Sequence, residues 1–267
     1  MFPGKLSFEF THAIARRPSR SVTGGLRAVD TGAPDLDSFL DHHETYVAAL
    51  RSTGALVSVL DELEDFPDSV FVEDTALCLP QGAIVMRPGA PSRLGEAAAM
   101  APHLQHFFKD VRFIKEPGFI EGGDILVTGT EILVGRSSRT NAQGIAQLGD
   151  LTEDWGIPVR EVITPPGVLH FKTDCSLLDA ETILSTPRLD ASGCFSRYRV
   201  IHTAPGEEAA ANAIRFNNLV LMADGFPGTA EALEKAGYTV KRIPNTQAAK
   251  LDGGMSCLSL RFSLPRS

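Results

Sequence analysis

Cysteine chemistry is the first possibility that the sequence raises. The stretch DGGMSCLSLRF places Cys257 after two glycines and before an apolar strand. Gly253 and Gly254 would let the backbone approach a ligand closely, which favours a nucleophile at this position. A thiol that fills the core is the alternative, because free cysteines are commonly buried. The other cysteines are expected to be two core thiols and one loop residue, in the order Cys78, Cys175 and Cys194.

A cysteine hydrolase also needs an imidazole that moves protons and an acid that orients the imidazole. Among the seven histidines, His170 in VLHFKTDC directly precedes a predicted strand and is the best general acid–base candidate. The pair Glu73 and Asp74 in FVEDTA stands in an apolar setting, where two carboxylates repel each other unless a cation lies between them. A guanidinium is such a cation, because its planar fork matches a carboxylate.

Two arginines lie just past predicted strand ends, Arg87 in MRPGAPSR and Arg139 in SSRTN. There they could bind a substrate carboxylate through paired hydrogen bonds. An ordinary surface arginine is the alternative for each of them. His103 and His106 have a three-residue spacing, but no further ligand cluster accompanies them, so we expect no metal site.

The elements that would position these side chains form an internal repeat. Four stretches begin with a polar residue, enter a short apolar strand, turn and continue into a second apolar strand, and a fifth shows the first strand alone. The spacings between the lead residues are 50, 50, 38 and 40, a period typical of propellers and similar arrays. The lead residues are Asp74, Asp124, Asp174, Asn212 and Asp252.

Helical patterns separate the strand pairs. Helices are expected over residues 35–50, 94–108, 142–155 and 229–236, with Thr229 as the N-cap of the last, and a further helix start over 205–213. The unit is therefore strand, strand, helix, strand. Five units closed into a ring predict a single catalytic domain over residues 1–267 with a central channel.

The lead residues would share one phase of the repeat and face that channel. Their four aspartates would make an acidic centre suited to a cationic small molecule. Each aspartate could instead be a turn former before a strand.

Composition excludes several classes of function. The chain has 267 residues, of which 43% are hydrophobic, and a net charge of −8. An acidic chain is a poor match for nucleic acid or an anionic membrane. No apolar run approaches the roughly 18 residues that span a bilayer, and we expect no signal peptide. Four cysteines without paired short spacing favour reduced thiols in a cytoplasmic enzyme.

Seven stretches of the chain, in order, resemble the dimethylarginine dimethylaminohydrolase family of guanidine-modifying enzymes. They are IARRPSRSVTGGL, PDSVFVEDTA, RPGAPSR, EGGDILVTG, SRTNAQG, LHFKTDCS and LDGGMSCLSLRF. The resemblance covers nearly the whole chain, and seven motifs in order are far more specific than any one of them. It implies an α/β fold, the five-bladed α/β propeller (pentein fold) of ββαβ repeats with pseudo-fivefold symmetry, in agreement with the repeat count.

The resemblance also implies roles for single residues. Cys257 would be the nucleophile, His170 the proton shuttle and Glu121 its partner carboxylate. The implied substrate-binding residues are Asp68, Glu73 and Asp74 for the guanidinium, Arg87 and Arg139 for the carboxylate, and Leu26 (through its carbonyl) and Asp252 for the amine. The implied reaction converts Nω-methylated arginine and water to citrulline and methylamine or dimethylamine through a covalent thiouronium on the cysteine, without an organic cofactor or catalytic metal.

Several alternatives stay open at this stage. An arginine deiminase-like hydrolase would share these residues but release ammonia, and a non-catalytic propeller would bind a cationic amino acid without turning it over. Asp174, four residues after His170, could face the channel and change the preferred substrate, or be a turn residue. The glycine-containing stretch 21–32 could be a lid or a plain surface loop. The expected partner is a small guanidino amino acid, and a homodimer is possible.

Overall fold

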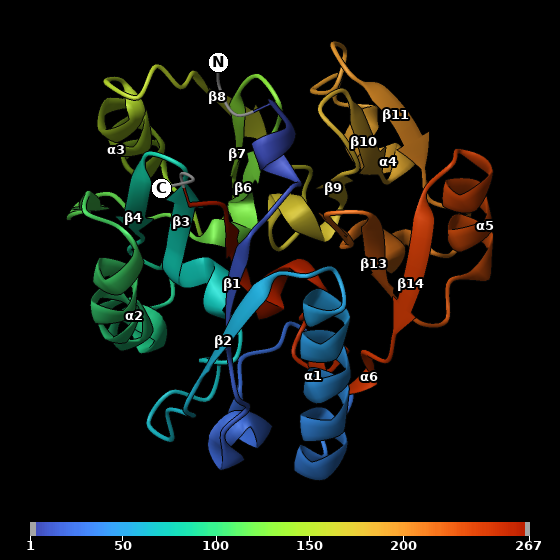
Figure 1. Ribbon diagram of the computed structural model, residues 1–267, viewed down its shortest axis with the longest axis horizontal. Coiled ribbons are helices and arrows are strands. Elements are labelled where there is room, and N and C mark those ends of the chain that lie inside the picture. Colours follow the sequence, from blue (N-terminus) through green and yellow to red (C-terminus); the bar gives the residue numbers. More distant parts are fainter. Residues whose placement is uncertain (1–3, 265–267) are drawn as a thin grey trace.

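The computed structural model describes residues 4–264 and contains five three-stranded sheets arranged around a common centre (Figure 1). In every sheet the middle strand pairs antiparallel with one neighbour and parallel with the other. A helix lies between the middle strand and its parallel partner in each unit. The predicted five-bladed α/β propeller of ββαβ repeats is confirmed.

Four units follow the chain in order. The first of these four comprises β3 (Ala76–Leu79), β4 (Gly82–Val85), α2 (Leu94–Phe107) and β5 (Val111–Phe113). The next comprises β6 (Ile125–Val127), β7 (Ile132–Arg136), α3 (Ala142–Thr152) and β8 (Val159–Ile163). Then come β9 (Cys175–Leu177), β10 (Thr182–Ser185), α4 (Pro187–Asp190) and β11 (Arg199–His202). The last of the four comprises β12 (Ile214–Phe216), β13 (Leu219–Ala223), α5 (Pro227–Lys235) and β14 (Thr239–Ile243).

The remaining unit is built from both ends of the chain. β15 (Leu260–Phe262) pairs antiparallel with β1 (His12–Arg16), with His12 opposite Phe262. β1 also pairs parallel with β2 (Leu56–Leu60), and α1 (Leu36–Arg51) connects the two. The fifth stretch of the repeat shows one strand in the sequence because its partner lies at the other end of the chain.

Local signals explain most of the helix ends. Asp35 caps α1, since its side chain accepts the N–H of Ser38 at 2.9 Å, and Asn141 caps α3 in the same way through Gly144. The predicted N-cap at Thr229 is wrong, because α5 begins with Pro227 and the Thr229 hydroxyl instead accepts the N–H of Ala204.

Other helical expectations were less accurate. The expected helix start at 205–213 is only the 3₁₀ turn η7 (Glu208–Ala211). The short helices α4 and α6 (Thr246–Ala249) were not expected, because four residues carry no readable period.

Short 3₁₀ turns precede the innermost strand of each unit. These turns are η3 (Val72–Thr75), η5 (Gly122–Asp124), η6 (Phe171–Thr173), η7 and η8 (Ser256–Leu258). Neighbouring turns contact each other, η3 with η8 and η5, and η6 with η5 and η7. Three further 3₁₀ turns lie elsewhere: η1 (Gly4–Ser7), η2 (Arg20–Gly24) and η4 (Pro91–Arg93). The ring of inner turns brings side chains from different units together at the centre.

The phase of the repeat is correct for four lead residues and wrong for the fifth. Asp74, Asp124, Asp174 and Asn212 lie one or two residues before their strands, whereas Asp252 lies eight residues before β15. Cys257 lies within the turn η8, not at a strand start. The extra residues form a loop that the sequence period could not reveal.

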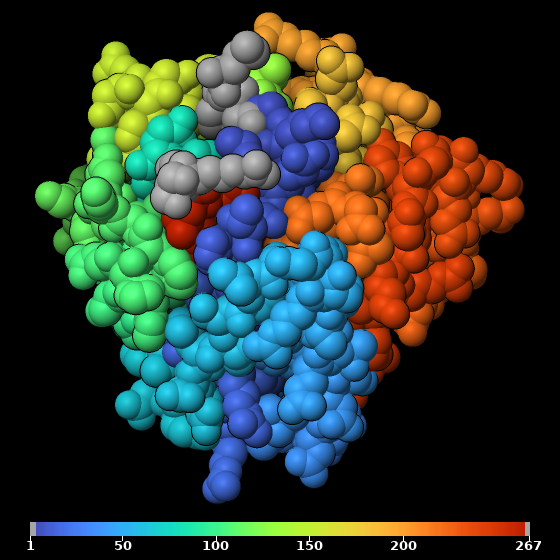
Figure 2. All heavy atoms as spheres, in the orientation of Figure 1, coloured from blue at the N-terminus to red at the C-terminus, as the bar shows by residue number. Residues whose placement is uncertain are grey.

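The core lies between the units. The middle strands β4 and β10 are buried along their whole length, as are most residues of β7 and β13, whereas the outer strands β2 and β11 are partly exposed. This gradient is expected when each sheet packs its inner strands against neighbouring units. The N-terminal segment from Gly4 on, in dark blue, lies over the middle of the face seen in Figure 2. Within residues 4–264, no helix is long and apolar enough to cross a membrane.

Candidate active site

A cavity of about 160 Å³ opens at the centre of the ring, and we call it the front pocket. Its walls come from the loop after η2, the segment around η3, the start of α2 and the turns η6 and η8. The lining residues are Leu26, Arg27, Ala28, Asp68, Phe71, Asp74, Arg93, Arg139, Leu169, His170, Leu251, Asp252, Gly253 and Cys257. Most of the residues predicted to act on substrate therefore meet in one place.

Cys257 is half-buried in this pocket. The two glycines before it are required by packing: a Cβ on Gly253 would lie 2.3 Å from the Phe71 ring, and one on Gly254 would lie 2.1 Å from the Asn212 side chain. The two glycines therefore allow close packing against Phe71 and Asn212, which are protein groups and not a ligand. Burial, followed by the charges of Glu73 and Asp74, raises the pKa of the Cys257 thiol to about 11. The thiol is neutral at pH 7 when the pocket is empty.

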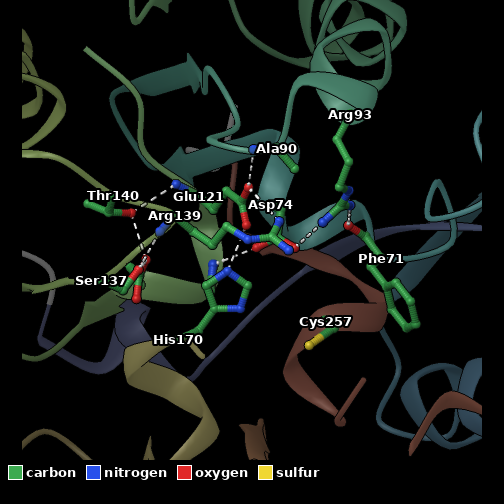
Figure 3. Close-up of polar contacts among 12 residues, drawn as sticks. Phe71, Asp74, Ala90, Arg93, Glu121, Ser137, Arg139, Thr140, His170 and Cys257 are labelled. Atoms are coloured by element: carbon green, nitrogen blue, oxygen red, sulfur yellow. Dashed lines mark hydrogen bonds and ion pairs between the residues drawn. The ribbon is translucent and has the colours of Figure 1, made fainter. Parts of the chain in front are cut away.

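His170 faces the same pocket and contacts Glu121, as Figure 3 shows. Its Nε2 lies 2.7 Å from Glu121 Oε2, and the Glu121 side chain is fully buried. Burial would lower the pKa of His170, but Asp74, the Glu121 hydrogen bond and Asp124 together raise it to about 9. Burial would likewise raise the pKa of Glu121, but the hydrogen bond and charge of His170, together with the charges of Arg93 and Arg139, outweigh burial and lower that pKa. The pair is an imidazolium and a carboxylate at neutral pH.

Asp74 and Asp68 are the buried aspartates that line the pocket. Asp74 Oδ2 accepts a hydrogen bond from Arg93 Nη1 at 2.6 Å, and Asp74 Oδ1 accepts the N–H of Gly123 at 2.8 Å. Asp68 Oδ1 accepts the N–H of Leu26 at 3.0 Å. Burial raises the pKa of Asp68 above its usual range.

The pocket arginines differ from those predicted. Arg139 lines the pocket and donates from Nη1 to Glu121 Oε1 at 3.3 Å. Arg93, which the sequence analysis missed, lines it as well and is held by Asp74 and Glu96. The three-residue spacing of Arg93 and Glu96 at the start of α2 is a signal for that pair. Arg87 is not brought to the pocket, because it donates to the exposed Glu116 at 2.6 Å.

Glu73 points away from the front pocket. Its Oε1 accepts from Lys172 Nζ and from Arg261 Nη2, each at 2.5 Å. All three residues line a second cavity of about 100 Å³, which we call the rear pocket. Glu73 does not line the front pocket, although its charge acts on Cys257 there, so its predicted contact with a guanidinium stays a prediction. Neither Lys172 nor Arg261 was predicted, since each is distant from Glu73 in the sequence.

Leu26 and Asp252 lie at the rim of the front pocket. Leu26 is 40% exposed, and Asp252 Oδ2 accepts the N–H of Ala28 at 2.6 Å. Asp252 adopts a left-handed backbone conformation with φ of 58°. Within the stretch 21–32, residues 21–24 belong to η2, and the loop that follows is attached to Asp68 and to Asp252. The role of the stretch 21–32 as a lid stays a prediction.

Two lead aspartates do not face the front pocket. Asp124 is buried and accepts hydrogen bonds from Ser137 and Thr140, both at 2.6 Å. Asp174 is buried and forms an ion pair with Arg188. The predicted acidic centre is therefore smaller than four aspartates, and Asp174 has a structural role within its own unit.

Asp74, Glu121 and His170 offer ligand atoms within 4.8 Å of one another, a spacing that could hold a metal ion. Each of them already has a charged partner, since Asp74 binds Arg93 and Glu121 binds both Arg139 and His170. Charge pairing is sufficient to explain why these side chains converge. The absence of a catalytic metal stays a prediction.

Comparison with known proteins agrees with this arrangement. The arginine deiminase family profile matches residues 40–222. The chain is 38% identical to the N(G),N(G)-dimethylarginine dimethylaminohydrolase of Pseudomonas aeruginosa over 95% of this chain and 100% of that protein. It is 35% identical to the protein of the same name from Streptomyces coelicolor, over 94% of this chain and 96% of that one.

Solved structures show the same relationship. The chain superposes with a TM-score of 0.93 on a cysteine-to-serine variant of the Pseudomonas aeruginosa enzyme complexed with citrulline, at 38% identity, over 96% of this chain and 100% of that one. The N-terminal domain of a cyanobacterial arginine dihydrolase superposes with a TM-score of 0.85 at 19% identity, over 95% of this chain and 99% of that one, and shares the fold. The chain belongs to the dimethylarginine dimethylaminohydrolase family, hydrolases within the guanidine-modifying pentein enzymes.

Proposed function

We propose that this protein hydrolyses Nω-methylated arginine to citrulline and dimethylamine or methylamine. The observation that carries the proposal is the front pocket, where Cys257 and His170 face one cavity together with two buried carboxylates, Asp68 and Asp74. Citrulline, the expected product, is bound in the related structure from Pseudomonas aeruginosa.

Charges of both signs suit an amino acid that carries a guanidinium. Asp68 and Asp74 lie deep in the pocket and would bind the guanidinium, since carboxylates pair with its planar N–H groups. Arg139 would bind the substrate carboxylate, and the Leu26 carbonyl and Asp252 at the rim would bind its amine. Such fixed positioning contributes several kcal/mol to lowering a barrier.

Substrate binding would also generate the nucleophile. The thiol of Cys257 is neutral in the empty pocket, because burial and two carboxylates raise its pKa to about 11. A bound guanidinium would offset the charge of Asp74 in the pocket and, with protonated His170, favour the thiolate as the proton leaves to solvent. Ionisation is therefore coupled to occupancy of the site.

The reaction then follows in two halves. The thiolate attacks the guanidinium carbon, and His170 donates its proton to the departing amine as the C–N bond breaks, which leaves a thiouronium on Cys257. Neutral His170 next takes a proton from water, and hydroxide attacks the same carbon. The C–S bond breaks, citrulline is released, and His170 is again protonated. Glu121 holds the imidazole throughout.

A citrulline assay across arginine, mono- and dimethylarginine and agmatine tests the proposal. We expect citrulline and methylamine or dimethylamine from the methylated arginines, and little from arginine or agmatine. The match of the arginine deiminase profile favours a second candidate, an arginine deiminase-type enzyme, for which arginine would be the best substrate and ammonia the product. Binding of all four compounds without product or Cys257 adduct would leave only a binding protein.

We also propose that residues 1–267 act as one catalytic domain in the cytoplasm. All four cysteines are free thiols in the structure, which suits a reducing compartment.

A further inference from the structure

Three lead residues of the repeat, Asp74, Asp124 and Asn212, form the same hydrogen bond to the neighbouring unit. Asp74 Oδ1 accepts the N–H of Gly123, and Asp124 Oδ1 accepts the N–H of Phe171, both at 2.8 Å. Asn212 Oδ1 accepts the N–H of Ser256 at 3.0 Å. In each case a side-chain oxygen binds the inner 3₁₀ turn of the next unit, and an uncharged oxygen performs this task as well as a carboxylate does.

The second atom of each side chain has a different partner. Asp74 Oδ2 accepts from Arg93, and Asp124 Oδ2 accepts from two hydroxyls. Asn212 Nδ2 instead donates to Cys257 Sγ at 3.8 Å. Because the Ser256 N–H requires an acceptor, the carboxamide oxygen must lie on that side, and the NH₂ group is left facing the sulfur.

The surroundings hold the carboxamide in this position. The Asn212 carbonyl accepts the N–H of Met255 at 3.3 Å, and Gly254 leaves space that a Cβ would take from the Asn212 side chain. The Gly254 N–H donates to the same sulfur at 3.5 Å. Two N–H groups on one sulfur stabilise its anionic form, because donors interact more strongly with a charged acceptor.

Stabilisation of the thiolate by these two N–H groups is important because carboxylates also surround the sulfur. Glu73 and Asp74 oppose a thiolate from η3, and Asp68 and Asp252 line the same pocket. Lys172, in η6, favours a thiolate. The other cationic residues that line the pocket are Arg27, Arg93, Arg139 and His170. Arg261 forms an ion pair with Glu73. An aspartate at position 212 would add another carboxylate next to the sulfur.

We propose that Asn212 activates Cys257 for attack, with its carboxamide oxygen holding η8 and its NH₂ group donating to the sulfur. The asparagine at this one lead position, where the equivalent residues of three other units are aspartates, is thus a feature of the unit that faces the nucleophile. This inference rests on the proposed function, since it takes Cys257 as the nucleophile.

Alkylation of Cys257 by iodoacetamide tests the proposal without any turnover. The rate is measured against pH, with mass spectrometry to restrict the signal to Cys257. Asn212→Asp keeps the shape and the acceptor for Ser256 but replaces the donor with a carboxylate. It is expected to lower the rate at pH 7 by tenfold or more, because a shift of one pKa unit changes the thiolate fraction about tenfold. The rate should recover at high pH.

Asn212→Ala removes the donor and adds no charge, so its rate at pH 7 should fall by a smaller factor of about three to ten. Asn141→Asp is the matched control. Its Oδ1 also accepts backbone N–H groups, and its Nδ2 faces the Pro117 carbonyl, outside the front pocket. Its alkylation profile should equal that of the unchanged protein.

If folded Asn212→Asp has the same alkylation profile as the unchanged protein, the proposal is overturned. If the Asp variant does not fold, an unchanged pH of half-maximal alkylation in Asn212→Ala overturns it. A merely structural role would lower the thermal midpoint of unfolding and leave the pH of half-maximal alkylation unchanged. If the protein fails to turn over any guanidine, the alkylation result still stands, so failure of the proposed function and failure of this inference are distinguishable.

Discussion

The front and rear pockets share several of the inner 3₁₀ turns but differ in how their charged side chains are paired. Along η3, Glu73 lines the rear pocket and Asp74 the front one, and along η8 the same holds for Ser256 and Cys257. The rear pocket has mainly apolar walls, and its carboxylate is neutralised by two cations. The front pocket has a thiol, an imidazolium and carboxylates near arginines.

The difference shows how adjacent residues can separate structural from chemical roles. Glu73 pairs with Lys172 and Arg261 and connects three units, so its charge is already used within the protein. Asp74 has one arginine partner and still faces the cavity where a ligand would bind. A short 3₁₀ turn makes this possible, because its successive side chains point in different directions. The following variants test the distinction.

The two cavities each contain a cysteine, which offers the largest expected contrast. Cys257→Ser should lose turnover by on the order of 10⁴-fold or more while still binding substrate, because the serine hydroxyl is a poor nucleophile here. Cys78→Ser, at the rear pocket, should keep turnover close to that of the unchanged protein. Steady-state citrulline formation and equilibrium binding measure both. Comparable losses in the two variants would contradict the division of roles.

His170 should be second in effect. His170→Ala removes the group that protonates the amine and deprotonates water, so kcat should fall by about 10²–10⁴-fold. Rapid-quench assays with mass spectrometry should show either no adduct or a trapped thiouronium on Cys257. Full activity would remove His170 from the reaction.

Glu73 should matter for folding. Glu73→Gln leaves Lys172 and Arg261 without their buried countercharge, which should lower the free energy of unfolding by about 3–5 kcal/mol. Urea denaturation measures it, with Glu116→Gln as the exposed control, expected to cost less than about 1 kcal/mol. A normal stability with a raised KM would instead return Glu73 to the substrate site.

The two arginines predicted to bind the substrate carboxylate should differ in their effect on KM. Arg139→Ala should raise KM for methylated arginine by about 10–100-fold, since a hydrogen bond to a charged group contributes about 1.5–3 kcal/mol. Arg87→Ala should change KM by less than about twofold, because its guanidinium binds Glu116. Initial-rate kinetics decide the matter, and an equal rise in both variants would restore Arg87 as part of the clamp.

The last contrast concerns pH. The pKa of His170 is raised to about 9 in the folded protein, against about 6.5 when unfolded, so protonated His170 contributes stability that is complete below about pH 6.5. That contribution is lost as the pH rises through about 9. The difference in unfolding free energy between the unchanged protein and His170→Gln should fall by about 2–3 kcal/mol across this window, as measured by urea titrations. A difference independent of pH would mean that His170 is neutral in the fold.

Local patterns were sufficient for the architecture and for part of the site. A repeat of about 40–50 residues predicts five units, and the cap at Asp35 predicts the start of α1, because both signals are written in neighbouring residues. Cys257 and His170 were predicted from their short contexts and the family resemblance, and the structure brings both to one pocket.

Sequence alone therefore determined the repeat, the fold and the side chains that can do chemistry in this protein. Only the tertiary structure decided which cavity each side chain faces. Glu73 is adjacent to Asp74, yet its partners lie 99 and 188 residues away, and Asn212 reaches Cys257 across 45 residues. Such contacts depend on how the units close into a ring, and spacing along the chain holds no record of distances across its centre.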